Sequence, residues 1–191
     1  VGLEAAMISR EAKSQSVLSK AKALQEKHVG RTLFASFEWL QRLNGVTLTL
    51  QAYENFLETY PRRRANVCLV MRCAEINERR FDSDRTKREC EELVARIKRK
   101  FGEEVIDYES SSTGVNGYQF DFSRSDRLAL WLASKVLIKT SVQEGLNMNP
   151  LEFVLVKEPP NKGVVILSEF TTSCAVLNGA MRINPWDVKN V

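Results

Sequence analysis

A short polar loop holds the residues of this chain whose types and spacing are best suited to bind an anion. The loop reads Glu144-Gly145-Leu146-Asn147-Met148, and Pro150 follows at a position typical of the first turn of a helix. Backbone N–H groups at a helix N-terminus bind phosphate, and a glycine lets the backbone approach a ligand closely. The loop could therefore hold a diphosphate, or it could only connect two elements. Its residues alone leave both interpretations open.

Other kinds of chemistry find little support in the sequence. His28 is the only histidine, which excludes a two-histidine metal site and disfavours a Ser–His triad. The four cysteines are Cys68, Cys73, Cys90 and Cys174. Their spacing fits no zinc site, so we expect free thiols in a reducing compartment, the cytoplasm. The motifs G-x-x-x-x-G-K-S/T and G-x-G-x-x-G are missing, and we expect neither a metal nor a cofactor.

Length and composition predict one soluble globular domain over residues 1–191. The chain is 43% hydrophobic and 27% charged, which is ordinary for such a domain. The net charge of +4 comes from well-mixed acids and bases, so we expect no nucleic-acid partner. Without a run of about 18 apolar residues, we expect no membrane-spanning helix. Because Val1 is not a natural first residue, we expect the domain to be excised from a longer protein.

Helical and strand patterns alternate along nearly the whole chain, which predicts a Rossmann-like α/β fold with a parallel sheet and helices on both faces. The expected strands are 31–37, 66–72, 105–108, 136–138, 163–167 and 181–183. The expected helices are 16–28, 47–60, 84–101, 125–134 and 150–157, with Ser83 as the cap of the third and a polar loop over 110–116. The loop 140–149 lies between a strand and a helix, where open α/β sheets bind their ligands.

Two segments carry a family resemblance. Residues 143–153 read QEGLNMNPLEF, and residues 167–186 include the phrases LSEF, LNGA and NPW at spacings close to VLVxSEFxGxxxxLxGAxxVNPW. These segments resemble the trehalose-6-phosphate synthases, UDP-forming retaining glycosyltransferases that join glucose from UDP-glucose to glucose-6-phosphate. The family pattern for the first segment is roughly RDGMNLxxxEY. The phrases SEF and NPW look closest to the fused synthase–phosphatase proteins.

This resemblance implies a fold and a set of ligands. The family fold is GT-B, two Rossmann-like lobes facing a cleft, and this chain would be the second lobe, which holds UDP or UDP-glucose. The missing N-terminal lobe and a fused or associated trehalose-phosphate phosphatase domain are the implied partners. By position in the motif, Glu144 would bind glucose hydroxyls, the backbone of 145–148 would meet the diphosphate, and Glu152 would hold the ribose. The alternative for Glu152 is a first-turn acid that stabilises a helix dipole.

The segment after the first expected strand departs from the family pattern. Active members read close to GVDRLDYxKG there, and their Arg and Lys neutralise the leaving diphosphate. This chain reads SFEWLQRLNGV over 36–46, so that Trp39 stands in place of the Arg and Asn44 in place of the Lys. Losing one charge-stabilising donor typically costs about 2.7–4 kcal/mol in the transition state. We therefore expect an impaired or inactive transferase.

Two alternatives remain at this point. The first is an active glucosyltransferase whose cationic clamp has moved to Arg42 and to Arg79 or Arg80. The second is a sensor that binds a UDP-sugar or a sugar phosphate without turnover.

Overall fold

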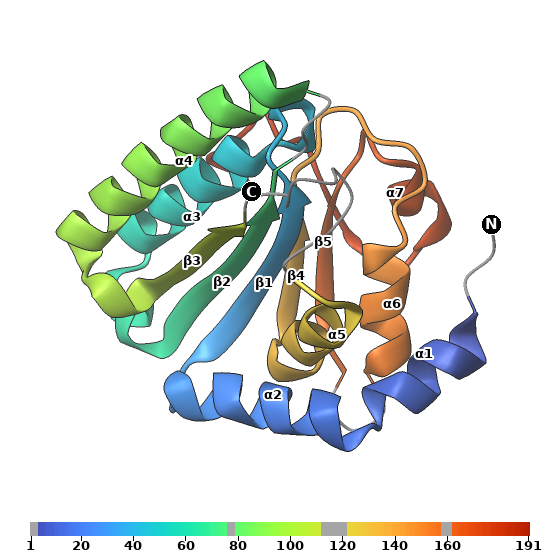
Figure 1. Cartoon of the computed structure of the whole chain (residues 1–191). Coiled ribbons are helices and arrows are strands. Elements are labelled where there is room, and N and C mark those ends of the chain that lie inside the picture. The colour runs from blue at the N-terminus through green and yellow to red at the C-terminus, as the bar shows by residue number, and fades with distance from the viewer. Residues whose placement is uncertain (1–3, 76–78, 112–121, 158–161) are drawn as a thin grey trace.

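The computed structural model describes residues 4–75, 79–111, 122–157 and 162–191. Six parallel strands form one sheet in the order β3-β2-β1-β4-β5-β6 (Figure 1). The strands are β1 Thr32–Trp39, β2 Val67–Ala74, β3 Ile106–Ser111, β4 Val136–Lys139, β5 Val164–Ser168 and β6 Met181–Ile183. The order reverses between β1 and β4, and this is the position where a parallel open sheet binds ligands at its carboxyl edge. The predicted fold class is confirmed.

Helices cover both faces of the sheet (Figure 1). On one face lie α3 Val46–Thr59 and α4 Arg80–Phe101; on the other lie α1 Ala5–Ala12, α2 Gln15–Lys27, α5 Arg124–Ala133 and α6 Asn149–Val156. The short α7 Thr172–Val176 follows β5, and the 3-10 turns are η1 Arg42–Asn44, η2 Pro61–Asn66 and η4 Glu103–Val105.

Each face of the sheet has its own hydrophobic core. Under α3 and α4, the strands contribute Leu69 and Met71, whereas Val70 and Ala35 face the helices of the other side. Residues of opposite parity along a strand point to opposite faces, and here both parities are apolar. This double burial explains the continuous apolar run that predicted a central parallel strand at 66–72.

The expected strands and helices all exist, with shifts at their ends. The strand predicted over 31–37 extends to Trp39, which pairs with Ala74 of β2. Two short helices, α1 and α7, were missed. Ser110 and Ser111 belong to β3 and not to a loop, while 112–116 lie outside the described residues.

The prediction of Ser83 as a helix cap is wrong. Helix α4 begins at Arg80, so Ser83 lies inside it and is only 1% exposed. A tertiary contact supports the additional turn, because the Asp82 carboxylate accepts a hydrogen bond of 3.3 Å from the backbone N–H of Arg42. Local capping signals were outweighed by this contact with η1.

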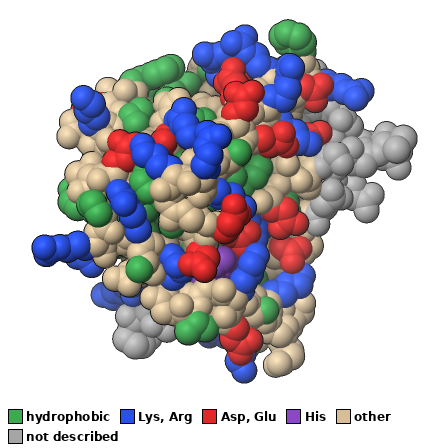
Figure 2. All heavy atoms as spheres, turned by 90° about the vertical axis from the view of Figure 1, so that its left-hand side faces the viewer, with side chains coloured by type: hydrophobic (Ala, Val, Ile, Leu, Met, Phe, Trp, Pro, Cys, Tyr) green, Lys and Arg blue, Asp and Glu red, His purple; other side chains and the backbone are tan. Residues whose placement is uncertain are grey.

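The surface over α4 and the β3 edge carries both signs of charge. Figure 2 shows basic and acidic side chains interspersed on this face, without one large area of a single sign. Ion pairs link α4 to α3 through Arg96–Glu54 and Lys100–Glu58. All four cysteines are buried and free, as predicted. Among the described residues, none of the helices has the length and apolar character needed to cross a membrane.

Gly45 joins the ends of β1 and β4. Its φ is +67°, a left-handed conformation that favours glycine, and a Cβ there would lie 2.0 Å from the carbonyl oxygen of Thr140. The Thr140 hydroxyl donates to the Gly45 carbonyl at 2.7 Å and lies 2.6 Å from the Thr49 hydroxyl. The start of α3 therefore rests directly on the beginning of the loop 140–148.

Gly45→Ala should destabilise the domain far more than Gly30→Ala. Both glycines have positive φ, but a Cβ at Gly30 would meet nothing within 4 Å. Both variants share the backbone strain of a residue with a Cβ at positive φ. The difference between their losses of unfolding free energy therefore measures the steric conflict with Thr140, which we expect to cost about 1–3 kcal/mol. Urea denaturation followed by circular dichroism measures both free energies of unfolding. Equal losses for the two variants would show that the close approach is unimportant.

Candidate functional site

A cavity of about 330 Å³ opens at the carboxyl ends of β1 and β4. Its lining residues are Phe37, Glu38, Trp39, Arg127, Glu144, Gly145, Leu146, Asn147, Met148 and Asn149. The whole loop selected from the sequence, Glu144 to Met148, is thus brought together with Trp39. Strand β1 supplies one wall, the loop before α6 supplies another, and α5 contributes Arg127.

The loop is held in shape by its own polar side chains. The Glu144 carboxylate accepts hydrogen bonds from Asn147 Nδ2 at 2.6 Å and from Ser141 Oγ at 3.1 Å. Asn147 Oδ1 in turn accepts from the backbone N–H of Asn149 at 2.8 Å, at the first residue of α6. Ser173 Oγ donates to the Asn147 carbonyl at 2.8 Å. Glu144 is therefore already engaged on both carboxylate oxygens.

A buried lysine lies behind this loop. Lys139, the last residue of β4, has a side chain that is 1% exposed, and its Nζ lies 2.6 Å from Glu38 Oε2 and 3.5 Å from Glu144 Oε1. Burial raises the pKa of Glu38 to about 7, against the opposing charge of Lys139 and with a further increase from Glu144. A hydrogen bond from the Asn44 side chain opposes this rise in the pKa of Glu38.

Glu152 forms a second buried ion pair beside the cavity. Its carboxylate accepts from Arg127 Nε at 2.9 Å and from Arg127 Nη2 at 3.0 Å, and the Trp131 indole N–H donates to it at 3.4 Å. The side chain of Glu152 is 6% exposed, and that of Arg127 is 21% exposed. The Arg127 guanidinium also lies 5.7 Å from the centre of the Phe37 ring. Glu152 is thus a partner of Arg127 and is not one of the residues that line the cavity.

Trp39 and Asn44, which stand where the family pattern has a cationic clamp, differ in their surroundings. Trp39 lines the cavity, whereas Asn44 is buried in η1 and is not among the lining residues. Of the candidate substitutes, Arg42 lines a different cavity of about 670 Å³ with residues of α3 and α4. Arg79 is exposed just before α4 and is not a lining residue of the Glu144 cavity. The fold therefore brings neither arginine to this cavity.

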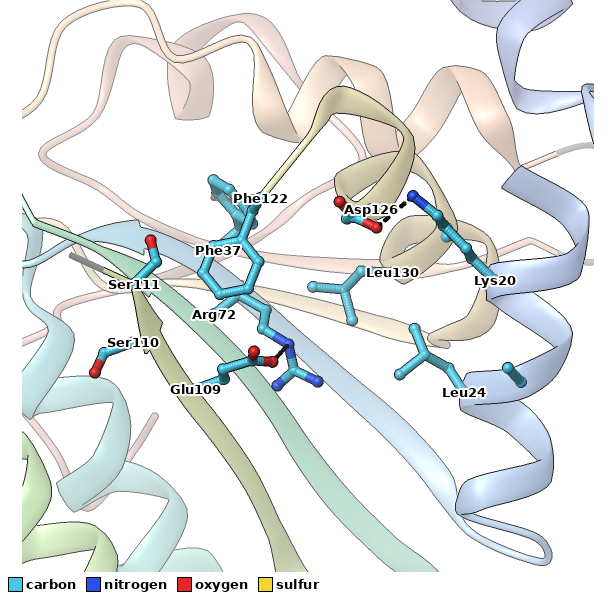
Figure 3. A pocket seen from close by; sticks show the side chains of 12 residues that line it. Lys20, Leu24, Phe37, Arg72, Glu109, Ser110, Ser111, Phe122, Asp126 and Leu130 are labelled. Atoms are coloured by element: carbon cyan, nitrogen blue, oxygen red, sulfur yellow. Dashed lines mark ion pairs between the residues drawn. The ribbon is translucent and has the colours of Figure 1, made fainter. Parts of the chain in front are cut away.

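A second cavity, of about 560 Å³, adjoins the first at Phe37 (Figure 3). Two ion pairs border it: Arg72–Glu109 at 3.2 Å from neighbouring strands, and Lys20–Asp126 at 2.7 Å from α2 and α5. The Phe37 and Phe122 rings meet edge to face at this border, with their centroids 5.9 Å apart (Figure 3). A ligand longer than the first cavity could extend in this direction.

Several residues at the site were not selected from the sequence. Glu38, Lys139 and Arg127 were passed over, although a signal existed for the first two, since each is a charged residue inside an otherwise apolar strand. A charge in such a strand needs a buried partner, so the two could have been paired. Arg127, the partner of Glu152, lies in a helix with other polar residues and gave no comparable signal in the sequence. Among the described residues, no group of three or more histidine, cysteine or acidic side chains is arranged to hold a metal ion.

Comparison with known proteins decides the family. The sequence pattern that defines glycosyltransferase family 20 matches residues 1–191. This chain belongs to glycosyltransferase family 20. The resemblance identified from the loop 143–153 and the segment 167–186 is confirmed.

Relatives in family 20 include both synthases and phosphatases by name. The chain is 29% identical over 194 residues to an α,α-trehalose-phosphate synthase (UDP-forming) of Dictyostelium discoideum, covering 100% of this chain and 25% of that protein. It matches the N-terminal domain of Candida albicans trehalose-6-phosphate phosphatase with a TM-score of 0.85 and 29% identity, covering 98% of this chain and 38% of that one. A Burkholderia xenovorans synthase in complex with glucose-6-phosphate shares the fold, with a TM-score of 0.88 at 24% identity over 99% of this chain and 40% of that one. This chain thus spans well under half the length of each relative.

The buried Glu38 should make stability depend on pH. Its pKa rises from 4.5 to about 7 on folding, so the folded state holds a proton that the unfolded state has released. The stabilisation is complete below pH 4.5 and is lost as the pH rises through about 7, by about 3 kcal/mol. Urea denaturation between pH 4 and pH 8 should show this loss in the wild type and not in Glu38→Gln.

The exposed Glu169→Gln serves as the matched control and should follow the wild type. If the free energy of unfolding changed with pH in the same way for the wild type and for Glu38→Gln, the titration would not belong to Glu38.

Proposed function

We propose that this chain is the donor-side lobe of a trehalose-6-phosphate synthase-like glycosyltransferase in trehalose biosynthesis, and that its transfer activity is impaired or absent. One observation carries the proposal: a tryptophan, Trp39, lines the cavity at the position that holds a clamp arginine in the family pattern. Among the described residues, Arg127 is the one Lys or Arg that lines this cavity, and Glu152 already engages it through two hydrogen bonds.

The electrostatic argument follows from the reaction. Transfer from UDP-glucose leaves charge on a diphosphate, and preorganised cations at that position lower the barrier. Removing one donor of this kind costs about 10²–10³ in rate, and here two are replaced. The two carboxylates that line the cavity, Glu38 and Glu144, oppose the approach of an anion. These facts support a lobe that keeps the family scaffold without its leaving-group chemistry.

The placement of the side chains bears differently on the two alternatives, an active enzyme and a sensor. An active enzyme with a relocated clamp finds no support in the placement of Arg42, which lines the α3–α4 cavity. A sensor without turnover would use the self-bonded loop 144–149, because a preorganised loop binds ligand at a lower entropic cost, but the lining carboxylates Glu38 and Glu144 disfavour an anionic ligand there. UDP, UDP-glucose or a sugar phosphate would be its ligand.

The whole protein is part of the proposal. The missing N-terminal lobe would complete the cleft, and a trehalose-phosphate phosphatase domain would be fused or associated, in line with the relatives that carry this name. Free buried cysteines support a reducing compartment, which we take to be the cytoplasm.

Calorimetric titration of UDP and UDP-glucose tests the lost clamp. We expect no measurable heat with the wild type, and binding with Trp39→Arg/Asn44→Lys, because the double variant restores two cations beside the cavity. Since Asn44 is buried, Trp39→Arg alone is measured as well and should recover part of the affinity. The matched control is Trp186→Arg, because Trp186 is 64% exposed and lines another cavity. This variant should show no measurable heat with either ligand.

Two results would refute this proposal. The first is binding of UDP by the wild-type lobe that Glu152→Ala abolishes, which would favour the sensor or the active enzyme. The second is formation of trehalose-6-phosphate by the full-length protein at an ordinary turnover of about 1–10³ s⁻¹.

A further inference from the structure

Arg127 separates the Glu152 carboxylate from the Glu144 cavity. Its guanidinium donates to both carboxylate oxygens, from Nε at 2.9 Å and from Nη2 at 3.0 Å. Arg127 is a lining residue of the cavity, whereas Glu152, in the first turn of α6, is not. The side chain of Glu152 is only 6% exposed. The guanidinium therefore borders the cavity, and the carboxylate lies behind it.

Aromatic side chains hold this ion pair in place. The Trp131 indole N–H donates to the Glu152 carboxylate at 3.4 Å, and the Arg127 guanidinium lies 5.7 Å from the centre of the Phe37 ring. Trp131 meets the Phe37 and Phe153 rings edge to face. Removing one partner of a buried ion pair is costly, because the other charge is left uncompensated. The pair is therefore a fixed part of the cavity wall.

Helix α5 sets the position from which Arg127 extends. The helix begins with a capping box, in which the Ser123 hydroxyl accepts from the Asp126 backbone N–H and the Asp126 carboxylate accepts from the Ser123 backbone N–H. Lys20 of α2 also pairs with Asp126 at 2.7 Å. Arg127 follows Asp126 directly, so its backbone belongs to a fixed helical turn and not to a loop. The side chain therefore starts from a constant position beside Glu152.

The two-point contact identifies what Arg127 displaces. A carboxylate accepts hydrogen bonds on both of its oxygens, and here two N–H groups of one guanidinium fill those positions on Glu152. A ligand with two adjacent hydroxyl groups, a vicinal diol, offers the same pair of donors. Arg127 and such a ligand would therefore compete for one carboxylate. Because Arg127 is part of the chain, it binds without the loss of translational and rotational freedom that a ligand incurs.

We propose that Arg127 is an internal lock on this cavity: it occupies the Glu152 carboxylate and so keeps the vicinal diol of a ligand out. The inference rests on the proposed function, because it concerns ligand binding in the same cavity. It adds a second barrier to binding, which is independent of the cations replaced by Trp39 and Asn44. The loss of cations weakens contacts with phosphate, whereas the lock blocks contacts with a diol.

The test removes the lock with Arg127→Met, which keeps a long side chain without its charge or its donors. The probes are uridine, which carries a vicinal diol, and 2′,3′-dideoxyuridine, which does not. Saturation-transfer NMR and calorimetry on the 191-residue chain should show no preference between them in the wild type. In Arg127→Met, the dissociation constant for uridine should be at least about tenfold lower than that for 2′,3′-dideoxyuridine, as expected for hydrogen bonds to a charged group.

Arg96→Met is the matched control. Arg96 also donates to one carboxylate, that of Glu54, through two nitrogen atoms, but it lines the α3–α4 cavity. Its loss should leave the two uridine probes indistinguishable, as in the wild type. Adding Arg127→Met to Trp39→Arg/Asn44→Lys should strengthen the binding of UDP but not that of inorganic pyrophosphate, because pyrophosphate has no diol.

The outcomes separate the lock from the lost clamp. If Arg127→Met gains no preference for uridine, the lock is refuted, while the calorimetry of UDP with the wild type still decides the lost clamp. If the wild type prefers uridine and Arg127→Met abolishes that preference, Arg127 binds the ligand and is no lock. If Arg127→Met fails to fold, Arg127→Lys is measured instead, since lysine keeps a positive charge beside Glu152 without the two-point geometry. A lysine variant without a preference for uridine would then refute the lock.

Discussion

The contact between β1 and β4 at the centre of the sheet is the constraint on which the site depends. These strands are neighbours in space but are separated by more than 90 residues, and their carboxyl ends meet where the strand order reverses. The Lys139–Glu38 ion pair and the Thr140–Gly45 hydrogen bond both cross this junction. The ion pair holds Glu38, which lines the cavity, and the hydrogen bond holds the start of α3. Neither could form if the register of the two strands shifted by one residue, because the side chains would then point to the opposite face.

Local patterns were sufficient for the order of elements and for the loop, and tertiary pairing accounts for what they missed. Glycine, proline and acidic residues in sequence marked 144–150, and the apolar runs marked the central strands because both faces are covered. Trp39 was also found, since it lies in a motif. Arg127 and Lys139 were not, because their meaning depends on partners 25 and 101 residues away. The start of α4 failed for the same reason, since Asp82 accepts a hydrogen bond from the backbone N–H of Arg42 in η1.

The two positions at which this chain departs from the family's cationic pattern lie apart from the packed interior. Trp39 and Asn44 lie at the rim of β1 and in η1, outside both hydrophobic cores. Neither side chain belongs to the core clusters that hold the helices against the sheet. By contrast, the buried pair Arg127–Glu152 is surrounded by Trp131 and Phe37, so losing either charge would leave the other unpaired in an apolar setting. Chemistry at the rim is therefore free to change while the ion pairs beneath it are constrained.

This separation bears on how family membership should be weighed. Membership in glycosyltransferase family 20 fixes the fold, and relatives named as synthases and as phosphatases share that fold with this chain. Function must then be argued from the groups that touch the ligand. In this lobe the charged and aromatic side chains that line the cavity are two carboxylates, two aromatic rings and an arginine that is already paired. Among the described residues, Arg127 is the one Lys or Arg in this lining, and Glu152 engages it. In our proposal, the side chains that separate binding a sugar from transferring it lie between Phe37 and Asn44.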